Sequence, residues 1–347
     1  MKKLSLTDVP KFLGQVGAVM DLFAPIRMSG ATNWGVWDKD RKADLNTLKS
    51  VKSPKDVFFP QCQTMYTVHK DEEGFSIDPM KLTDQPFCVF GIRPCDVKAL
   101  EVMDQVFLAD PVDTFYKARR ENAILVSLAC HRPAQTCFCS VFGTDASECE
   151  GADVAMWMIG EDLFMEGCTQ KGHAFLEQFA DLLQDTEDTA AVEAEKESIR
   201  AITKKLPYAS LSLEGWGAGM TDEKFDDPNW QQLSDACLAC GTCTFVCPTC
   251  QCYDIKDYDT GHGIQRYRCW DSCMYSDFTL MAAANNRTTQ MQRYRQRFMH
   301  KLVYFPTNNN GMYMCVGCGR CVDRCPQSLN IVKVIKTMDP GRKEEKA

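Results

Sequence analysis

Two short runs of cysteine carry the clearest chemistry in this 347-residue sequence. Residues 237–247 read CLACGTCTFVC, residues 315–325 read CVGCGRCVDRC, and a proline follows each run. Each run has the spacing C-x2-C-x2-C-x3-C-P, which is typical of the thiolate ligands of [4Fe–4S] clusters. The two-residue gaps let three thiolates surround one cluster from a tight turn. The sequence therefore predicts two [4Fe–4S] clusters.

The two runs are expected to exchange their last cysteines. In proteins with two such clusters, the fourth cysteine of each run binds the cluster of the other run. The first cluster is thus expected to be bound by Cys237, Cys240, Cys243 and Cys325. The second is expected to be bound by Cys315, Cys318, Cys321 and Cys247. Structural zinc is disfavoured, because zinc sites rarely have a third cysteine so close to the second and no His-x3–5-His follows either run.

Two further groups stand out among the 20 cysteines. The first group is Cys95, Cys130, Cys137 and Cys139. These cysteines follow the ends of two apolar segments that are expected to be strands. An open α/β sheet usually has its binding site at the ends of its strands. We therefore expect either a third [4Fe–4S] cluster or a zinc ion at these cysteines. The alternative is that they are separate buried or free thiols. The second group is Cys250, Cys252, Cys269 and Cys273. We interpret it as packing against the clusters, with a thiol/disulfide-reducing site as the alternative.

The composition excludes several classes of function. A net charge of −8 and an isoelectric point near 5.3 argue against binding to nucleic acid. No apolar segment is long enough to span a membrane. The first residues, MKKLSLTDVPKFLGQVG, lack a secretory apolar segment, so we expect a cytoplasmic protein with reduced cysteines. No G-x-G-x-x-G motif follows a predicted strand and no P-loop is present, so the sequence indicates no nucleotide site of its own.

The elements that position these cysteines form three parts. Apolar runs at residues 86–91, 123–129 and 152–159 alternate with helical patterns. This alternation predicts an α/β or α+β domain over residues 1–175. The domain is expected to begin with a helix at residues 4–22 and to hold the third candidate site. Residues 176–229 are expected to be a helical connector and linker. Residues 230–337 are expected to be a mainly helical, ferredoxin-like domain with two clusters, and residues 338–347 a tail.

The helical prediction for the last part depends on the long insert between the two cysteine runs, residues 248–314. Its apolar residues at helical spacing are Met291, Tyr294, Phe298 and Leu302. The basic residues between them are Arg293, Arg295, Arg297 and Lys301. We interpret these cations as a solvent-exposed face that offsets cluster charge, the alternative being that they bind a phosphate or the carboxylates of a partner.

Several segments resemble a known family. They are GIRPCDVKAL at residues 91–100, CHRPAQTCFCS at 130–140, CLACGTCTFVCPTCQCYD at 237–254, RCWDSCMYSDF at 268–278 and the stretch 299–326. In these segments the sequence is similar to the [4Fe–4S] dicluster family of sulfhydrogenase beta subunits and anaerobic sulfite reductase A subunits. The resemblance implies an α-helical ferredoxin fold for the cluster domain and a role in anaerobic metabolism.

The resemblance also implies a function. In such complexes a partner subunit with a flavin, expected to be FAD, reacts with NAD(P)H. The iron–sulfur subunit relays single electrons between it and a catalytic subunit of the hydrogenase, sulfite reductase or heterodisulfide-reductase type. We therefore expect this chain to be a non-catalytic electron-transfer subunit of an oxidoreductase complex. The alternative is that the chain is itself a catalytic subunit that reduces thiols or disulfides at Cys250, Cys252, Cys269 and Cys273 beside a cluster.

Overall fold

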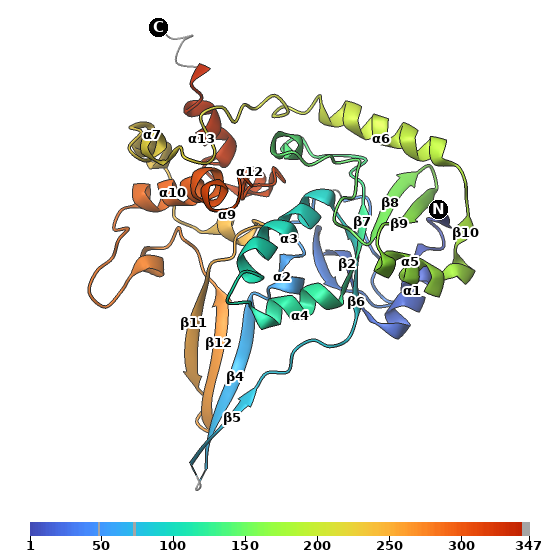
Figure 1. The fold of residues 1–347 in the computed structure, drawn as a ribbon, viewed down its shortest axis with the longest axis horizontal. Helices are drawn as coiled ribbons and strands as arrows, with labels where there is room; N and C mark the ends of the chain where they lie inside the picture. Colours follow the sequence, from blue (N-terminus) through green and yellow to red (C-terminus); the bar gives the residue numbers. More distant parts are fainter. Residues whose placement is uncertain (48, 72–73, 342–347) are drawn as a thin grey trace.

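The computed structural model describes residues 1–47, 49–71 and 74–341. Within these residues, an eight-stranded sheet forms the centre and a four-stranded sheet projects from it (Figure 1). The strands of the central sheet, in spatial order, are β10 (Gln184–Asp185), β1 (Lys2–Ser5), β9 (Asp162–Gly167), β8 (Val154–Ile159), β7 (Ala123–Leu128), β6 (Phe87–Ile92), β2 (Asp21–Met28) and β3 (Ala31–Val36). Strands β2, β6, β7 and β8 are parallel, and the outer strands are antiparallel.

Helices cover both faces of the central sheet. One face carries α1 (Val9–Val19) and α5 (Gln170–Gln178), and its core is built around the ring of Phe12, which contacts Phe90, Phe175 and Phe179. The core of the other face includes residues of α2 (Lys55–Phe58), α3 (Pro94–Phe107), α4 (Thr114–Asn122) and α6 (Thr189–Thr203). A parallel sheet with helices on both faces is an α/β arrangement, so the α/β content expected from the sequence is confirmed.

The parallel strands lead directly to candidate site residues. All six residues of β6 are buried, as its continuous apolar run predicts. Cys95 follows β6 in the first turn of α3, which begins with a proline at its first position. Cys130 follows β7 in a loop, two residues after the strand ends at Leu128. The ends of two adjacent strands therefore deliver two cysteines to one edge of the sheet.

The helix expected at residues 4–22 is shorter than its apolar pattern suggests. Residues 2–5 form strand β1, which pairs antiparallel with β9 and β10, and α1 begins only at Val9. Leu4 is buried in the sheet, while Lys2 and Lys3 pair with Asp185 and Asp162. Pairing with distant strands thus overrides the local helical periodicity. Because β10 is part of this sheet, the sheet extends past residue 175.

The C-terminal part combines short helices with a β-hairpin. Its helices are α7 (Thr221–Phe225), α8 (Asn229–Ser234), α9 (Thr242–Phe245), α10 (Gln290–Met299), α11 (Phe305–Asn308), α12 (Arg320–Arg324) and α13 (Ile331–Thr337), with a π-helical turn, η4 (His300–Tyr304), between α10 and α11. A 3-10 turn, η3 (Ser276–Thr279), also lies in this part, whereas the 3-10 turns η1 (Cys139–Phe142) and η2 (Ala180–Leu182) lie earlier in the chain. The mainly helical character expected for residues 230–337 is not confirmed, because strands β11 (Tyr253–Asp259) and β12 (Gly263–Trp270) occupy part of the insert.

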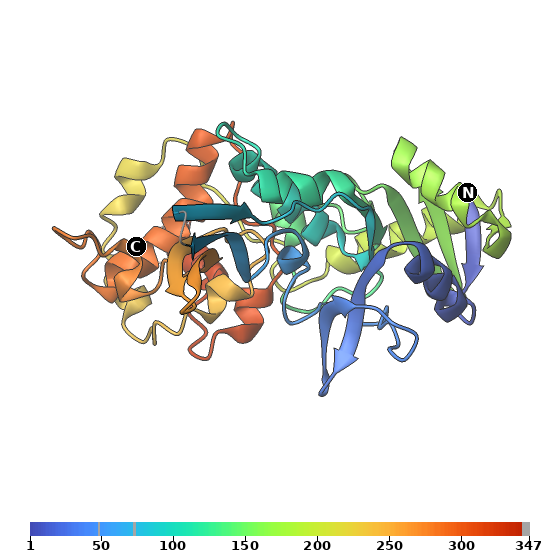
Figure 2. The same ribbon diagram turned by 90° about the horizontal axis from the view of Figure 1, so that it is seen from below.

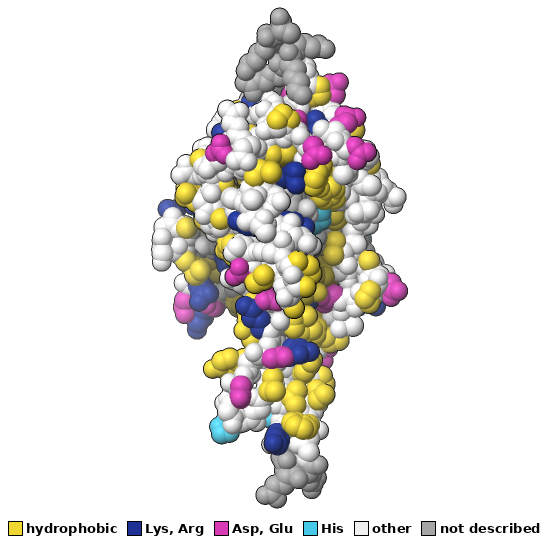
Figure 3. Space-filling view, turned by 90° about the vertical axis from the view of Figure 1, so that its left-hand side faces the viewer, with side chains coloured by type: hydrophobic (Ala, Val, Ile, Leu, Met, Phe, Trp, Pro, Cys, Tyr) yellow, Lys and Arg dark blue, Asp and Glu magenta, His cyan; other side chains and the backbone are white. Residues whose placement is uncertain are grey.

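The hairpin β11–β12 joins two strands from the N-terminal third of the chain. The order of this projecting sheet is β11-β12-β4-β5, where β4 is Cys62–Asp71 and β5 is Gly74–Pro79. Hydrophobic side chains lie exposed along the projection (Figure 3), among them Phe75, Ile77 and Ile264. The hairpin between the two cysteine runs and two strands from the N-terminal third of the chain thus form one continuous sheet. In Figure 2 the orange and red C-terminal helices gather at one end of the molecule, and the N-terminus lies at the other.

Candidate metal centres

The first candidate centre is a cavity of about 30 Å³ lined by four cysteines. They are Cys237, Cys240, Cys243 and Cys325, the set grouped from the sequence. Three of them come from the loop and first residues of α9, and the fourth directly follows α12. The side-chain amide of Gln290 donates to the sulfur of Cys237 at 3.3 Å, and the amide of Leu329 donates to the sulfur of Cys325 at 3.2 Å. Such N–H donors are among the contacts that tune iron–sulfur centres.

The second candidate centre is a cavity of about 20 Å³. Its cysteines are Cys247, Cys315, Cys318 and Cys321, again the set grouped from the sequence. The amide of Gly317 donates to the sulfur of Cys315 at 3.5 Å. The last cysteine of each run therefore lies with the first three cysteines of the other run.

The third candidate centre is another cavity of about 20 Å³, at the edge of the central sheet. It is lined by Cys95, Cys130, Cys137 and Cys139. Cys318, which lines the second cavity, also lines this one. The structure thus brings together four thiols from the ends of two strands and from the loop at residues 130–139, directly beside the second cysteine run.

The loops of the second and third cavities touch through their backbones. The amide of Phe138 donates to the carbonyl oxygen of Gly317 at 2.8 Å. A Cβ atom at Gly317, where φ is +61°, would lie 2.3 Å from the carbonyl oxygen of Phe138. A Cβ atom at Gly319 would lie 2.2 Å from the carbonyl oxygen of Thr136. Only glycine allows this approach, so these glycines hold the two sets of cysteines side by side.

The cysteine sets fit iron–sulfur clusters better than single ions. In the part of the chain that the structure describes, no three His, Cys, Asp or Glu side chains are close enough to bind one metal ion. The four thiols of each set instead line one common cavity. Four thiolates are the ligand complement of a [4Fe–4S] cluster. Burial raises the pKa of Cys243 and of Cys318 to about 12, and binding of a metal by these residues would require loss of the thiol protons.

Buried cations lie beside the first two cavities. Arg297 lines both of them and is 2% exposed. Its Nη2 donates to the carbonyl oxygen of Cys243 at 3.1 Å, whereas Nε and Nη1 have no hydrogen-bond partner among the described residues. Lys301, also buried, lines the second cavity and donates to the hydroxyl of Thr249 at 2.9 Å. A buried cation needs a compensating negative charge, which a cluster bound by four thiolates provides.

The third cavity has a similar buried cation. Arg93 lines it and donates from Nη2 to the carbonyl oxygens of Leu45 and Thr47, both at 3.0 Å. Its Nη1 is buried without a partner among the described residues. The third cavity thus shares with the other two the combination of four thiols and an incompletely compensated guanidinium.

Comparisons with known proteins agree with these features. A family model described as a 4Fe-4S dicluster domain matches residues 236–329. Over 342 residues, the chain is 31% identical to Sulfhydrogenase 2 subunit beta of Pyrococcus furiosus, and the match covers 98% of each chain. The chain belongs to this dicluster family of sulfhydrogenase beta subunits. No solved structure matches the chain. Among the described residues of this family member, no helix is both long and apolar enough to cross a membrane.

Two of the basic residues on α10 and η4 differ from the expectation of a solvent-exposed face. In this dicluster protein Arg297 and Lys301 are buried against the cavities, whereas Arg295 packs on the ring of Phe225. The signal in the sequence is their spacing of four residues, which puts both on one face of a helix. Tyr294 and Phe298 are buried as well, so α10 turns both these apolar residues and Arg297 toward the interior.

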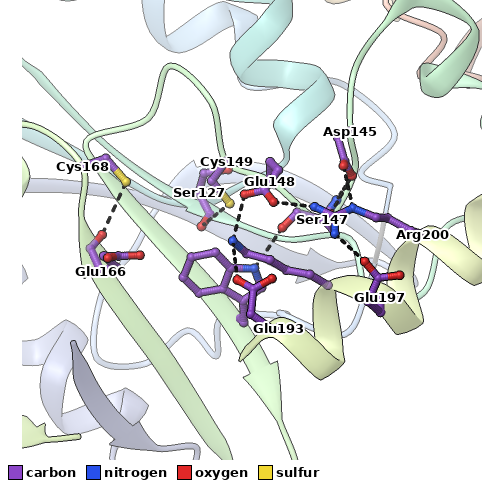
Figure 4. Close-up of polar contacts among 12 residues, drawn as sticks. Ser127, Asp145, Ser147, Glu148, Cys149, Glu166, Cys168, Glu193, Glu197 and Arg200 are labelled. Carbon is purple, nitrogen blue, oxygen red and sulfur yellow. Dashed lines mark hydrogen bonds and ion pairs between the residues drawn. The ribbon is translucent and has the colours of Figure 1, made fainter. Parts of the chain in front are cut away.

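The remaining cysteines of this family member do not form one group. Cys252 lies close enough to Cys273 for the two thiols to influence each other's pKa, and the same holds for Cys250 and Cys247. Cys269 lies apart on β12, where it faces Cys62. Near the central sheet, Cys149 donates to the carbonyl oxygen of Ser127 at 3.4 Å and Cys168 to that of Glu166 at 3.7 Å (Figure 4). The set Cys250, Cys252, Cys269 and Cys273 is therefore divided between three places.

An ion-pair network fixes the segment that follows the third candidate centre. Arg200 of α6 donates to Asp145 at 2.9 Å and to Glu148 at 2.7 Å (Figure 4). Lys196, one helical turn earlier, pairs with Glu148 at 3.1 Å. These contacts hold residues 145–148 against α6, a few residues after Cys139. The helix thus supports the loop that carries part of the third cysteine set.

Proposed function

We propose that this chain is an iron–sulfur electron-transfer subunit that binds three [4Fe–4S] clusters. The observation that carries the proposal is the presence of three cavities, each lined by its own set of four cysteines, with Cys318 of the second set also lining the third cavity. The first set is Cys237, Cys240, Cys243 and Cys325. The second set is Cys315, Cys318, Cys321 and Cys247. The third set is Cys95, Cys130, Cys137 and Cys139.

Shared residues support an arrangement of the three clusters in a row. Arg297 lines the first and second cavities, and Cys318 lines the second and third. When bound, such clusters accept and release one electron at a time. The residues of the chain bind the clusters through sulfur, donate N–H groups to it and place buried cations beside it, and these factors set the reduction potentials.

The first cavity is the end of the row that lies nearest to solvent. Cys240 is exposed, and its neighbour Leu238, which also lines the cavity, is 62% exposed. An exposed apolar side chain beside a redox centre suits contact with another protein. We propose that a redox partner docks there.

Two partners follow from the proposed function. One is a flavin subunit, expected to carry FAD, that reacts with NAD(P)H. The other is a catalytic subunit, of which hydrogenase is favoured over the sulfite reductase and heterodisulfide-reductase types because the similar protein is named as a sulfhydrogenase subunit. The chain itself is then non-catalytic and works in the cytoplasm.

The function is tested by anaerobic purification of the tagged chain from its own cells. The expected result is co-purification of a flavoprotein and a catalytic redox subunit, with NAD(P)H bleaching the visible iron–sulfur absorbance of the complex. Removal of the flavoprotein should abolish the bleaching. A chain that purifies alone, or whose absorbance does not respond to NAD(P)H in the intact complex, would contradict the proposed relay.

A further inference from the structure

Two cysteines outside the three cavities face each other across the projecting sheet. Cys62 of β4 and Cys269 of β12 are direct partners in an antiparallel pair of strands. Both strands are interior in the order β11-β12-β4-β5. The pair therefore links a strand from the N-terminal third of the chain to the hairpin between the two cysteine runs.

The backbone hydrogen bonds define the position of this pair. The amide of Trp270 donates to the carbonyl oxygen of Gln61 at 2.9 Å. A bond between the residues just beyond Cys62 and Cys269 puts these two cysteines at a non-hydrogen-bonded position of the ladder. At such positions the Cα atoms are about 4.5 Å apart and the side chains are at their closest. Disulfides span Cα separations of about 4.4–6.8 Å, so a bond between these sulfurs requires little backbone movement.

The two thiols differ in their access to solvent. Cys62 is exposed, whereas Cys269 is half-buried. Burial raises the pKa of the Cys269 thiol. Because solvent access governs which thiol an oxidant reaches, Cys62 is the thiol that an oxidant meets first, and Cys269 is placed to resolve the product.

We propose that Cys62 and Cys269 form a reversible disulfide, with a low-molecular-weight disulfide as the oxidant. The Cys62 thiolate attacks one sulfur of the oxidant, and the first thiol of the oxidant leaves. Cys269 then attacks the sulfur of Cys62 in the mixed disulfide, and the second thiol leaves. Two protein thiols are oxidised, the oxidant is reduced to two thiols, and the protons of the cysteines pass to those leaving groups.

The place of the disulfide in the fold gives it a structural effect. It would fasten β4 to β12, and the next residue on β12, Trp270, packs on Phe245 of α9 with ring centroids 6.3 Å apart. Helix α9 carries Cys243 of the first candidate centre. Exposed or strained disulfides are the labile ones, and in reducing compartments the disulfides that form are usually transient or sensing. The pair thus suits a reversible modification near the first centre.

The test uses the full, iron-loaded chain under anaerobic conditions. The protein is equilibrated with mixtures of glutathione and glutathione disulfide, quenched with acid, alkylated and mapped by mass spectrometry without reduction. The expected result is a peptide linked through Cys62 and Cys269 in the wild type. The link should disappear on treatment with excess dithiothreitol.

Three variants make this test specific. Cys168→Ser, which removes another exposed thiol, should keep the linked peptide. Cys62→Ser should lose it. Cys269→Ser should accumulate glutathione on Cys62, because the resolving thiol is gone. The proposal is overturned if the wild type retains glutathione on Cys62 with Cys269 free, or if no linked peptide forms at ratios that modify Cys168.

Discussion

Asp96 and Arg320 form a buried ion pair at 2.5 and 2.7 Å, although they lie 224 positions apart in the sequence. Their side chains are 1% and 2% exposed. Asp96 follows Cys95 of the third candidate centre, and Arg320 precedes Cys321 of the second. The pair therefore ties the first turn of α3 to α12 and fixes the two cysteine sets relative to each other.

Replacing Asp96 tests the structural role of this pair. Asp96→Asn removes the carboxylate that pairs with the buried guanidinium of Arg320, and we expect the free energy of unfolding to fall by about 3–5 kcal/mol. Urea unfolding under anaerobic conditions measures the change. The control is Asp257→Asn, which breaks the exposed pair with Arg266 and should have no measurable effect. Equal effects of the two substitutions would show that the buried pair has no special role.

Gly317→Ala tests the close approach of the second and third cysteine sets. The new Cβ would collide with the carbonyl oxygen of Phe138, so we expect the loops to separate and bound iron to be lost. Gly160→Ala is a matched control, because Gly160 has a similar φ of +60° and nothing within 4 Å of the added Cβ. It should cost only about 1–2 kcal/mol of backbone strain and retain the iron. Full retention of iron in Gly317→Ala would contradict the packing argument.

Arg297→Met tests the charge between the first two centres. Reduction adds negative charge to a cluster, and a nearby buried cation stabilises that charge. The loss of the cation should therefore lower the reduction potential by on the order of 60 mV, which is a tenfold change in a one-electron equilibrium. Potentiometric titration followed by electron paramagnetic resonance measures the shift. Arg295→Met removes a cation that packs on Phe225 instead, and it should leave the potentials nearly unchanged. A shift as large in this control would remove the special role assigned to Arg297.

The stability of the protein should depend on pH through His300. Burial, with further contributions from Lys301 and Arg287, lowers the pKa of His300 from 6.5 to about 4. Between these values the unfolded chain binds a proton that the folded chain does not, so stability falls as pH falls from about 6.5 to about 4. His300→Gln should remove on the order of 2 kcal/mol of the stability difference between pH 8 and pH 5. Urea unfolding at both pH values checks this, with the exposed His262→Gln as control. An identical pH dependence of wild type and His300→Gln would contradict it.

Local patterns predicted more of the candidate sites than of the surrounding fold. The spacing of the two runs grouped eight cysteines into two sets, and the structure brings each set to one cavity; cluster binding itself stays a prediction. Strand β1 escaped prediction because Leu4 is buried by strands far along the chain. The alternating pattern of the hairpin, YDIKDYD and GIQRYRCW around Gly261 and Gly263, was a strand signal that the helical interpretation of the insert overlooked. The burial of Arg297 depends on the groups that occupy the two adjacent cavities, and the helical spacing of residues in the sequence does not reveal those groups.

The most direct test is the iron and acid-labile sulfide content of the anaerobically purified chain. Three clusters predict about twelve irons and twelve sulfides per chain, and Cys130→Ala should lower both to about eight while Cys168→Ala should not. A wild-type chain that holds about eight irons unaffected by Cys130→Ala, or zinc without labile sulfide, would contradict the account.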